Sequence, residues 1–339
     1  MAKEATIYDI AAHLNISAAT VSRALNNKPR VKQKTIDKVK KAAGELGYRH
    51  NMLASNLRRQ KSKTIGLLLH ELNSNFVTSV LSGIEKVATA EGYDLLIAHS
   101  AEDGLREIAN AKNIFSKRVD GLIASLALGT KNIEHFTPFF ERKIPVVFFD
   151  RVPDTDNCIK VVIDNYKAGY DATAHLIQNG YRHIAHITAE LSRNVYNERY
   201  KGYKSALQDH HLPFDESLIS VCSRNKEDIV KSVNQLLEHR PDAFFITNDF
   251  AAAVCMAELK KKGLRVPDDI GVFGFNNDIL GDLITPLLST VDYPGSQTGE
   301  AAARELFNLL KYEDNKETYK KIIIPSKIII RESSVKHKR

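Results

Sequence analysis

The apolar positions near the start of the chain repeat at helical spacing. They recur every three or four residues, at Ile7, Ile10, Ala11 and Leu14. Thr6 and Asp9 have the spacing of a capping box, in which the two side chains satisfy backbone N–H groups of the first turn. The pattern predicts a short helix that ends near Leu14.

A second short helix is predicted over residues 18–25, with Ser17 as its N-cap and only a tight turn before it. Helices joined so closely must cross steeply. The crossing should bury Ile10, Ala11, Ile16, Val21 and Leu25. The opposite face then carries Ala18, Ala19, Ser22 and Arg23. Small residues allow close approach to DNA base edges, and Arg23 can bond a guanine or a phosphate.

A third helix is predicted from about Gln33 to Leu46, with Gly47 ending it. Its apolar stripe consists of Ile36, Val39, Ala43 and Leu46, and lysines surround the stripe at positions 32, 34, 38, 40 and 41. Each lysine could contact a DNA phosphate or remain solvated. Residues 51–59 also have helical spacing after an N-capping Asn51, but a helix this short should become ordered only against a partner.

From Ser62 onward, runs of β-forming residues alternate with amphipathic stretches. Strands are predicted at residues 64–70, 93–99, 120–125, 146–150, 160–163, 183–188, 243–247 and 270–275. Helices are predicted between them, for instance at 76–91, 166–179, 200–210 and 250–262. This alternation is typical of parallel sheets in a doubly wound α/β fold. The strands are too many for one small sheet, so we expect two subdomains with a cleft between them.

Polar residues follow several of the predicted strands, where parallel sheets bind ligands. They are Asp150 with Arg151, Asp164 with Asn165, Asn248 with Asp249, and Asn276 with Asn277 and Asp278. Arg199 is expected to open the helix after the strand that ends at residue 188. Such groups suit a ligand dense in hydroxyls or carboxylates. For Asp164, Asn248 and Asp249, simple capping of the following helix is an equally open interpretation.

Charge separates the chain into two parts. Residues 1–63 hold 14 Lys or Arg against 4 Asp or Glu, whereas residues 64–339 hold 34 against 37. A small basic module on a near-neutral body is typical of binding to a phosphate backbone. No apolar run is long enough for a membrane span, and no signal peptide is evident, so a cytoplasmic, nucleoid-associated protein is expected.

The sequence offers no catalytic or metal-binding motif that we can identify. GxSxG, Walker A and HExxH patterns are absent, and no cofactor is expected. Cys158, Cys222 and Cys255 are far apart and are interpreted as buried or incidental thiols. His183 and His186 fall on opposite faces of a strand, which argues against a shared metal. An enzyme and a transporter's solute-binding protein are therefore the less favoured alternatives.

Three N-terminal phrases resemble the headpiece of the lac-repressor family of bacterial regulators. They are TIYDIAA from Thr6, SAATVSRALN from Ser17, and LGY from Leu46. The resemblance implies a helix-turn-helix whose second helix enters the major groove. It assigns base readout to Ala18, Ala19 and Arg23, and backbone positioning to Thr20, Ser22, Asn26 and Tyr48. Thr6 and Ser17 are also expected to contact DNA.

By the same resemblance, the segment after residue 50 is a hinge helix that pairs with its dimer mate in the minor groove. Asn51, Ala54 and Leu57 would contact DNA there, with Leu57 as the kinking wedge. The family usually has Pro before the capping Asn, whereas this chain has His50. Leu57 could instead be a linker residue that packs on the core.

The remainder resembles the periplasmic sugar-binding-protein fold that this family uses as its sensor, with matching phrases such as FDR at residue 149, RYKGY at 199 and TND at 247. Arg199 would anchor the effector. Its other contacts would be Asp150, Arg151, Asn248, Asp249 and Asn276, with Phe76 and Phe275 as apolar walls. Many family members have Asp at the position of Asn276, and an amide there can accept an anion. The expected effector is therefore a sugar or sugar acid.

The predicted architecture is an all-α helix-turn-helix headpiece (1–49), a hinge helix and linker (50–61), and an α/β core of two doubly wound parallel-sheet subdomains (62–339). We expect an N-subdomain of about 62–161 plus 291–322 and a C-subdomain of about 162–290 plus 323–339. No leucine-heptad helix follows the last strand, so a homodimer is expected on double-stranded, palindromic operator DNA.

Overall fold

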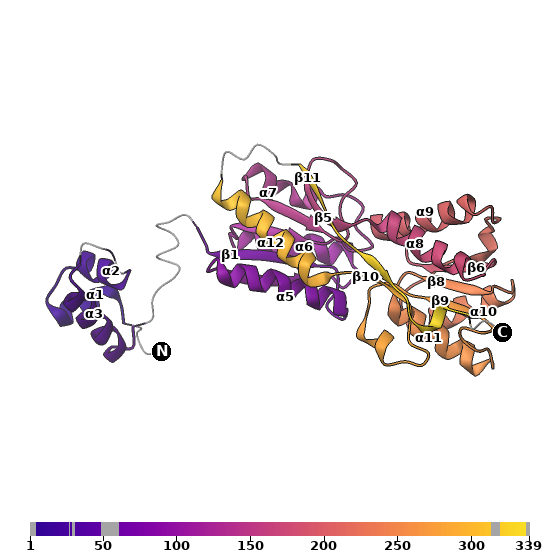
Figure 1. Ribbon diagram of the computed structural model, residues 1–339. Helices are drawn as coiled ribbons and strands as arrows, with labels where there is room; N and C mark the ends of the chain where they lie inside the picture. The colour runs from indigo at the N-terminus through magenta and orange to yellow at the C-terminus, as the bar shows by residue number, and fades with distance from the viewer. Residues whose placement is uncertain (1–4, 27, 29–30, 49–60, 313–318, 337–339) are drawn as a thin grey trace. The chain divides into compact units, whose positions relative to one another are not determined.

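The structure is a computed structural model that describes residues 5–26, 28, 31–48, 61–312 and 319–336 (Figure 1). The chain divides into two compact units, residues 1–62 and residues 63–339. Among the described residues, no helix has the length and apolar character needed to cross a bilayer. The predicted hinge contacts Asn51, Ala54 and Leu57, and also His50, lie outside the described residues.

Three helices form the first unit: α1 (Ile7–Leu14), α2 (Ala18–Leu25) and α3 (Gln33–Glu45). The predicted capping box at Thr6 is confirmed, because Thr6 N donates to Asp9 Oδ2 at 2.7 Å and Asp9 N donates to Thr6 Oγ1 at 3.4 Å. The predicted N-cap of α2 is also confirmed, since Ser17 Oγ accepts from Thr20 N at 3.1 Å. Both caps satisfy N–H groups that the helix itself leaves without partners.

The core of this unit contains the predicted Ile10, Ala11, Val21, Ile36 and Val39, with Ile16 and Leu25 half-buried at its edge. The prediction that Leu46 lies on the buried stripe of the third helix is wrong. Leu46 is 37% exposed, because α3 ends at Glu45 and the chain turns through Gly47 at φ +65°. Ala42 occupies a buried position on the stripe instead.

The second unit has two lobes. The first lobe contains a six-stranded parallel sheet in the order β11-β5-β4-β3-β1-β2. Its strands are β1 (Thr64–Leu69), β2 (Asp94–His99), β3 (Gly121–Ala124), β4 (Val146–Phe149), β5 (Ile159–Ile163) and β11 (Lys320–Ile324). Its helices are α5 (Asn75–Ala90), α6 (Gly104–Ser116), η1 (Glu134–Phe136), α7 (Thr137–Glu141) and α12 (Gly295–Lys311). Helices α5 and α12 cover one face of the sheet, and α6 and α7 cover the other.

The second lobe contains a four-stranded parallel sheet in the order β7-β6-β8-β9. Its strands are β6 (Ile184–Thr188), β7 (Ile219–Val221), β8 (Ala243–Ile246) and β9 (Gly271–Phe273). Its helices are α8 (Asn165–Gln178), α9 (Asn194–Asp209), η2 (Glu216–Leu218), α10 (Lys226–Leu237), α11 (Asp249–Lys261) and η3 (Ile279–Asp282). Helices α8 and α9 cover one face, and α10 and α11 the other. The short strand β7 was not predicted from the sequence.

Three chain segments connect the lobes. Strand β5 leads into α8, β10 (Thr290–Asp292) leads back toward α12, and β11 leads into β12 (Lys327–Ile329) and η4 (Glu332–Ser334). Strands β10 and β12 pair antiparallel between the two sheets (Figure 1). One hydrophobic cluster runs through both lobes and includes Ile65, Val161, Tyr203 and Phe245. The two lobes therefore share one hydrophobic core.

Two helix pairs pack closely because glycines face backbone atoms. A Cβ atom added to Gly202 on α9 would lie 2.1 Å from Tyr166 O on α8, and one added to Gly169 on α8 would lie 2.4 Å from Arg199 O. The pair α5 and α12 has the same arrangement, with Gly299 facing Val80 O at 2.1 Å. The glycine contacts thus fix the distance between α8 and α9, and with it the position of Arg199.

We predict that Gly202→Ala destabilises the second unit by about 1–3 kcal/mol, because the added methyl group must displace backbone rather than a flexible side chain. Urea unfolding of the full chain, followed by circular dichroism, measures the change. Gln208→Ala, on an exposed position of the same helix, is the matched control and should change the free energy of unfolding by less than about 0.5 kcal/mol. Equal effects of the two substitutions would show that the close approach is not under steric constraint.

Candidate DNA-binding face and ligand cleft

Helix α2 presents a polar face with small side chains. Val21 and Ala24 are buried against the other helices, while Ala19 and Arg23 are exposed and Ala18 and Ser22 are half-buried. The exposed guanidinium of Arg23 thus projects from a surface that a base edge could approach closely.

The other predicted DNA contacts lie around this face or support it. Thr6 and Ser17 are exposed N-caps, and the hydroxyls of Ser17 and Thr20 are 2.9 Å apart. Asn26 ends α2 and donates through Nδ2 to Ser22 O at 2.7 Å. Tyr48 packs half-buried against the core of the unit. These uncharged side chains have structural roles in the free protein. Arg23, the one charged residue among the predicted contacts that the structure describes, forms no ion pair with another described residue.

The second unit brings six strand ends together. His70 and Glu71 follow β1, Glu102 follows β2, Asp150 and Arg151 follow β4, Arg224 follows β7, Asn248 follows β8, and Asn276 follows β9. Ligands of doubly wound sheets bind at these carboxyl ends. A cavity here is lined by His70, Glu71, Ser74, Phe76, Asp150, Arg151, Val195, Tyr196, Arg199, Arg224, Thr247, Asn248, Asn276 and Tyr293. It measures about 20 Å³, so the cleft is almost closed.

Arg199 is a buried anchor at the centre of the cleft. Its Nε donates to Asn165 Oδ1 at 2.9 Å, its Nη1 donates to Thr247 O at 3.1 Å, and its guanidinium lies 3.5 Å from the ring centroid of Phe275. Burial lowers the pKa of Arg199. The prediction that Arg199 opens its helix is wrong. Helix α9 begins at Asn194, five residues earlier, so Arg199 lies in the second turn of the helix.

Asp150 lies opposite Arg199 on the first lobe. Its Oδ1 accepts from Tyr293 Oη at 2.6 Å, and its backbone is left-handed at φ +56°. Burial raises the pKa of this carboxyl, against the opposing effect of Arg151. Tyr293 also stacks on Phe76, with ring centroids 4.0 Å apart. An acceptor, a cation and aromatic walls therefore surround one small volume.

Ion pairs cross the cleft. Arg224, from the second lobe, forms a bidentate pair with Glu71 of the first lobe at 2.6 and 2.8 Å and also reaches Glu102 at 2.8 Å. Arg151 donates to the other oxygen of Glu102 at 2.6 Å and to Tyr196 Oη at 3.1 Å. We refer to Glu71, Glu102, Arg151 and Arg224 as the cleft ion-pair network. Its charges occupy the space that a bound ligand would need.

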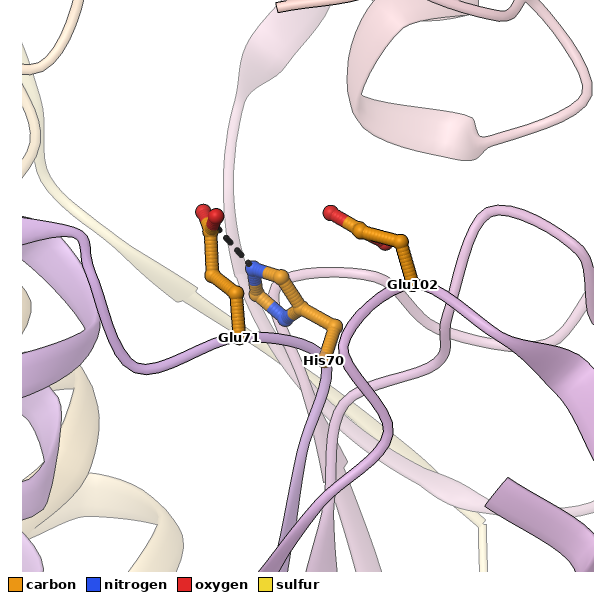
Figure 2. A group of neighbouring side chains, drawn as sticks. All are labelled: His70, Glu71 and Glu102. Carbon is orange, nitrogen blue, oxygen red and sulfur yellow. Dashed lines mark ion pairs between the residues drawn. The ribbon is translucent and has the colours of Figure 1, made fainter. Parts of the chain in front are cut away.

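His70, Glu71 and Glu102 also form a group whose possible metal-ligand atoms all lie within 4.8 Å of one another (Figure 2). Both carboxylates are already neutralised by arginines of the cleft ion-pair network. His70 Nδ1 lies 2.9 Å from Ser125 Oγ, and the pKa of His70 is held well below its usual value by burial and then by Arg151 and Arg224. A cation here would have to displace two guanidinium groups, so the donor set alone does not indicate a metal centre.

Six of the eight predicted effector contacts line the cavity: Phe76, Asp150, Arg151, Arg199, Asn248 and Asn276. Phe275 lies behind Arg199, and Asp249 is fully buried, accepting from Thr290 Oγ1 and Asp278 N at 2.7 Å each. The capping interpretation is confirmed for Asp164 and Asn248, whose side chains accept from Lys167 N and Ala251 N. For Asn248, capping and a position in the cavity wall are compatible.

Sequence reasoning missed His70, Glu71, Glu102, Tyr196, Arg224 and Tyr293. The rule used for Asp150, that polar residues after parallel strands face a ligand, would have found His70, Glu71 and Glu102 if applied to every predicted strand. Arg224 could not be found in this way, because β7 was not predicted. Tyr196 was missed because the predicted helix began at Arg199, three residues after it, and Tyr293 was missed because it follows β10, which was not predicted.

A basic helix-turn-helix unit joined to a two-lobed α/β core with a polar cleft is the architecture of a DNA-binding transcriptional regulator with a ligand-binding type of core. Residues 6–51 match the family described as bacterial regulatory proteins, lacI family. Residues 62–332 match the periplasmic binding proteins and sugar binding domain of the LacI family. The chain belongs to the lacI family, as a DNA-binding transcriptional regulator with a sugar-binding domain.

Similar proteins agree with this assignment. Catabolite control protein A of Priestia megaterium is 32% identical over 97% of this chain and 99% of its own length. The HTH-type transcriptional repressor PurR of Vibrio atlanticus (strain LGP32) is 30% identical over 92% of this chain and 94% of its own. The solved complex of the transcriptional regulator CelR with cellobiose has 25% identity and a TM-score of 0.73, covering 97% of this chain and 100% of that one.

We predict that Glu71 and Arg224 are energetically coupled. A double-mutant cycle with Glu71→Gln and Arg224→Met, measured by urea unfolding, should give a coupling energy of about 2 kcal/mol. Arg224→Met leaves the largely buried Glu71 without its guanidinium partner, and Glu71→Gln removes one of the two carboxylates that Arg224 bonds. The exposed helical pair Lys167 and Asp171, changed to Met and Asn, is the control and should give about 0.3–0.5 kcal/mol. If both cycles give the smaller value, solvent screens the cleft pair as fully as a surface pair.

Proposed function

We propose that α2 enters the major groove of operator DNA. Base readout is assigned to Ala18, Ala19 and Arg23, with backbone contacts from Thr6, Ser17, Thr20, Ser22, Asn26 and Tyr48. The proposal is supported by the exposed, small-residue face of α2 and by the exposed lysines of α3 beside it. In the hinge segment, the assignments of Asn51, Ala54 and Leu57 rest on the family resemblance.

Arg23→Ala should weaken binding to a selected palindromic site by about 1–3 kcal/mol and reduce discrimination at one base pair of each half-site. The site is obtained by selection from random DNA with the full-length chain, and affinities are measured by fluorescence anisotropy at several salt concentrations. Lys41→Ala, which removes an exposed cation on α3 that is 3.9 Å from Glu45, is the control. It should leave base discrimination intact. If Arg23→Ala discriminates between base pairs as well as the original protein does, Arg23 does not read a base.

We also propose that the cleft between the lobes binds a sugar or a sugar acid, and that this ligand controls operator affinity. The observation that carries the proposal is the convergence of Asp150, Arg199, Asn248 and Asn276 on one cavity with Phe76 at its wall. Hydrogen-bonding groups around an aromatic wall suit a polyhydroxylated ring. Arg199 would anchor the ligand. Asp249 and Phe275 would support the site from behind.

A ligand must first open the cleft ion-pair network, since the present cavity of about 20 Å³ has no room for a sugar. Arg151 and Arg224 would then be released from Glu102 and Glu71, and their guanidiniums would favour an anionic substituent on the ligand. Opening and closing would change the spacing of two bound headpieces. A coupling of about 1–3 kcal/mol between ligand and operator suffices for regulation.

The proposed assembly is a homodimer that acts as a repressor in the cytoplasm, associated with the nucleoid, without catalytic activity. Dimerisation is supported by apolar residues exposed on one edge of the first lobe, where Ile97 of the edge strand β2 is 44% exposed and Leu105 of α6 is 79% exposed. Exposed apolar patches of this kind commonly mark protein interfaces. Twofold symmetry of the dimer would match a palindromic operator.

Asn276→Asp should discriminate between the two ligand classes. The Asn276 side chain forms no hydrogen bond within the described part of the chain and lies in the cavity wall. A carboxylate at this position would repel a sugar acid but not a neutral sugar. A thermal-shift screen identifies the ligand, and calorimetry then measures affinity. We expect at least a tenfold loss for a sugar acid and less than a threefold change for the corresponding neutral sugar. Equal losses would exclude a charge-based role for this amide.

A further inference from the structure

A second and larger cavity lies beside the segments that connect the lobes. It measures about 650 Å³ and shares no lining residue with the ligand cleft. Its walls come from strands β5 and β11, the beginning of α8, the loops of residues 130–133 and 152–156, and the beginning of α9. Both lobes thus contribute to it, and a ligand bound here would contact both.

A buried cation without an acidic partner lines this cavity. Arg193 is only 9% exposed, and its Nη2 donates to Thr130 O. Its Nε has no hydrogen-bond partner among the described residues, and none of their carboxylates lies within ion-pair distance of the guanidinium. Burial lowers the pKa of Arg193, against the opposing effect of Glu107, which lies beyond ion-pair distance. A buried guanidinium normally has its donors satisfied, so this one favours an anion beside it.

Lysines converge on the same cavity. Lys160 on β5 and Lys321 on β11 are direct partners in the parallel register, so two like charges lie side by side on neighbouring strands. Lys131 adds a third from the adjoining loop. Within the described ranges, no carboxylate forms an ion pair with any of the three. Like charges on adjacent strands repel, and an anion between them would remove that cost.

The N-terminus of α9 adds to the positive potential. This 16-residue helix has Arg193 at its N-cap position, with no side-chain cap hydrogen bond. The first turn of α9 therefore lacks a capping side-chain oxygen, and a cation at the positive end of a helix dipole is unfavourable. Four acidic residues also line the cavity. Asp154, Asp156 and Asp164 are exposed, as are Lys131 and Lys321, so solvent screens these charges of both signs. Asp164 also caps α8, and Glu198 is paired with Lys201 at 2.8 Å.

We propose that this cavity is a second ligand site, which binds a small metabolite carrying phosphate or carboxylate groups between Arg193, Lys160 and Lys321. The site is also connected to the cleft. Asn194, the residue after Arg193, donates to Asp150 O at 2.9 Å and accepts from Val152 N at 3.0 Å, so it holds the segment that carries Asp150 and Arg151. An anion that draws in the start of α9 acts directly on a wall of the ligand cleft.

The test uses the full-length chain and two probes, inorganic pyrophosphate and citrate, at constant ionic strength. Calorimetry should detect one site per chain for at least one probe, and the probe that binds identifies a phosphate or a carboxylate preference. The double substitution Lys160→Gln and Lys321→Gln should raise the Kd at least tenfold. Lys38→Gln with Lys40→Gln, which removes the same charge from the basic first unit, should change it less than twofold. Absence of binding by both probes, or equal losses in both double variants, would overturn the proposal.

A second variant separates binding from folding. Asn197 lines the cavity in the first turn of α9, and its side chain forms no hydrogen bond with another described residue. Asn197→Asp places a negative charge where it stabilises the helix terminus and repels an anion. We expect its melting temperature without ligand to be equal to or above that of the original protein, and its Kd for the probe to rise at least tenfold. Unchanged affinity in a well-folded Asn197→Asp variant would contradict an anion site at this position.

Discussion

Charge pairing across the ligand cleft is the interaction on which the arrangement of the two lobes depends. The first lobe contributes Glu71 and Glu102, and the second contributes Arg224, whose guanidinium bonds both. Buried ion pairs add little net stability, because desolvation offsets most of the attraction. They do fix geometry, since a single unpaired member is costly. The network therefore holds the two lobes in one relative position. A ligand that supplies replacement partners for its charges can still separate the lobes reversibly.

Apolar packing provides the stability that the charged cleft does not. One hydrophobic cluster passes through both lobes, and the glycine contacts between α8 and α9 hold the helix that carries Arg199 against its neighbour. The resulting burial also sets the electrostatics of the cleft. It raises the pKa of Asp150 and lowers the pKa values of Arg199 and His70, because burial disfavours their charged forms. A hydrogen-bonding or oppositely charged group that enters the cleft offsets this cost.

The connecting segments link the ligand cleft to the second cavity. Asp150 and Arg151 lie between the cleft on one side and Asn194 and Arg193 on the other. A movement of α9 against the first lobe changes both cavities together, because the helix contributes Arg199 to one and Arg193 to the other. A regulator built in this way has the physical means to combine two chemical signals in one lobe movement.

The sequence by itself determined the fold class, the three helices of the first unit and the exposed face of α2. Helical spacing, the caps at Thr6 and Ser17 and the alternation of strands with helices are local signals, and Arg23 is exposed because its neighbours on α2 must be buried. Asp150 and Asn276 were predicted from their positions after parallel strands, and Arg199 from the family resemblance, and all three line the cleft cavity. Only the tertiary structure decided that Arg224 meets Glu71 and Glu102, and that Lys160 lies beside Lys321. These pairings depend on strand order, register and lobe closure. All three arise from contacts between segments that are distant in the sequence, and such contacts produce no local pattern of residues.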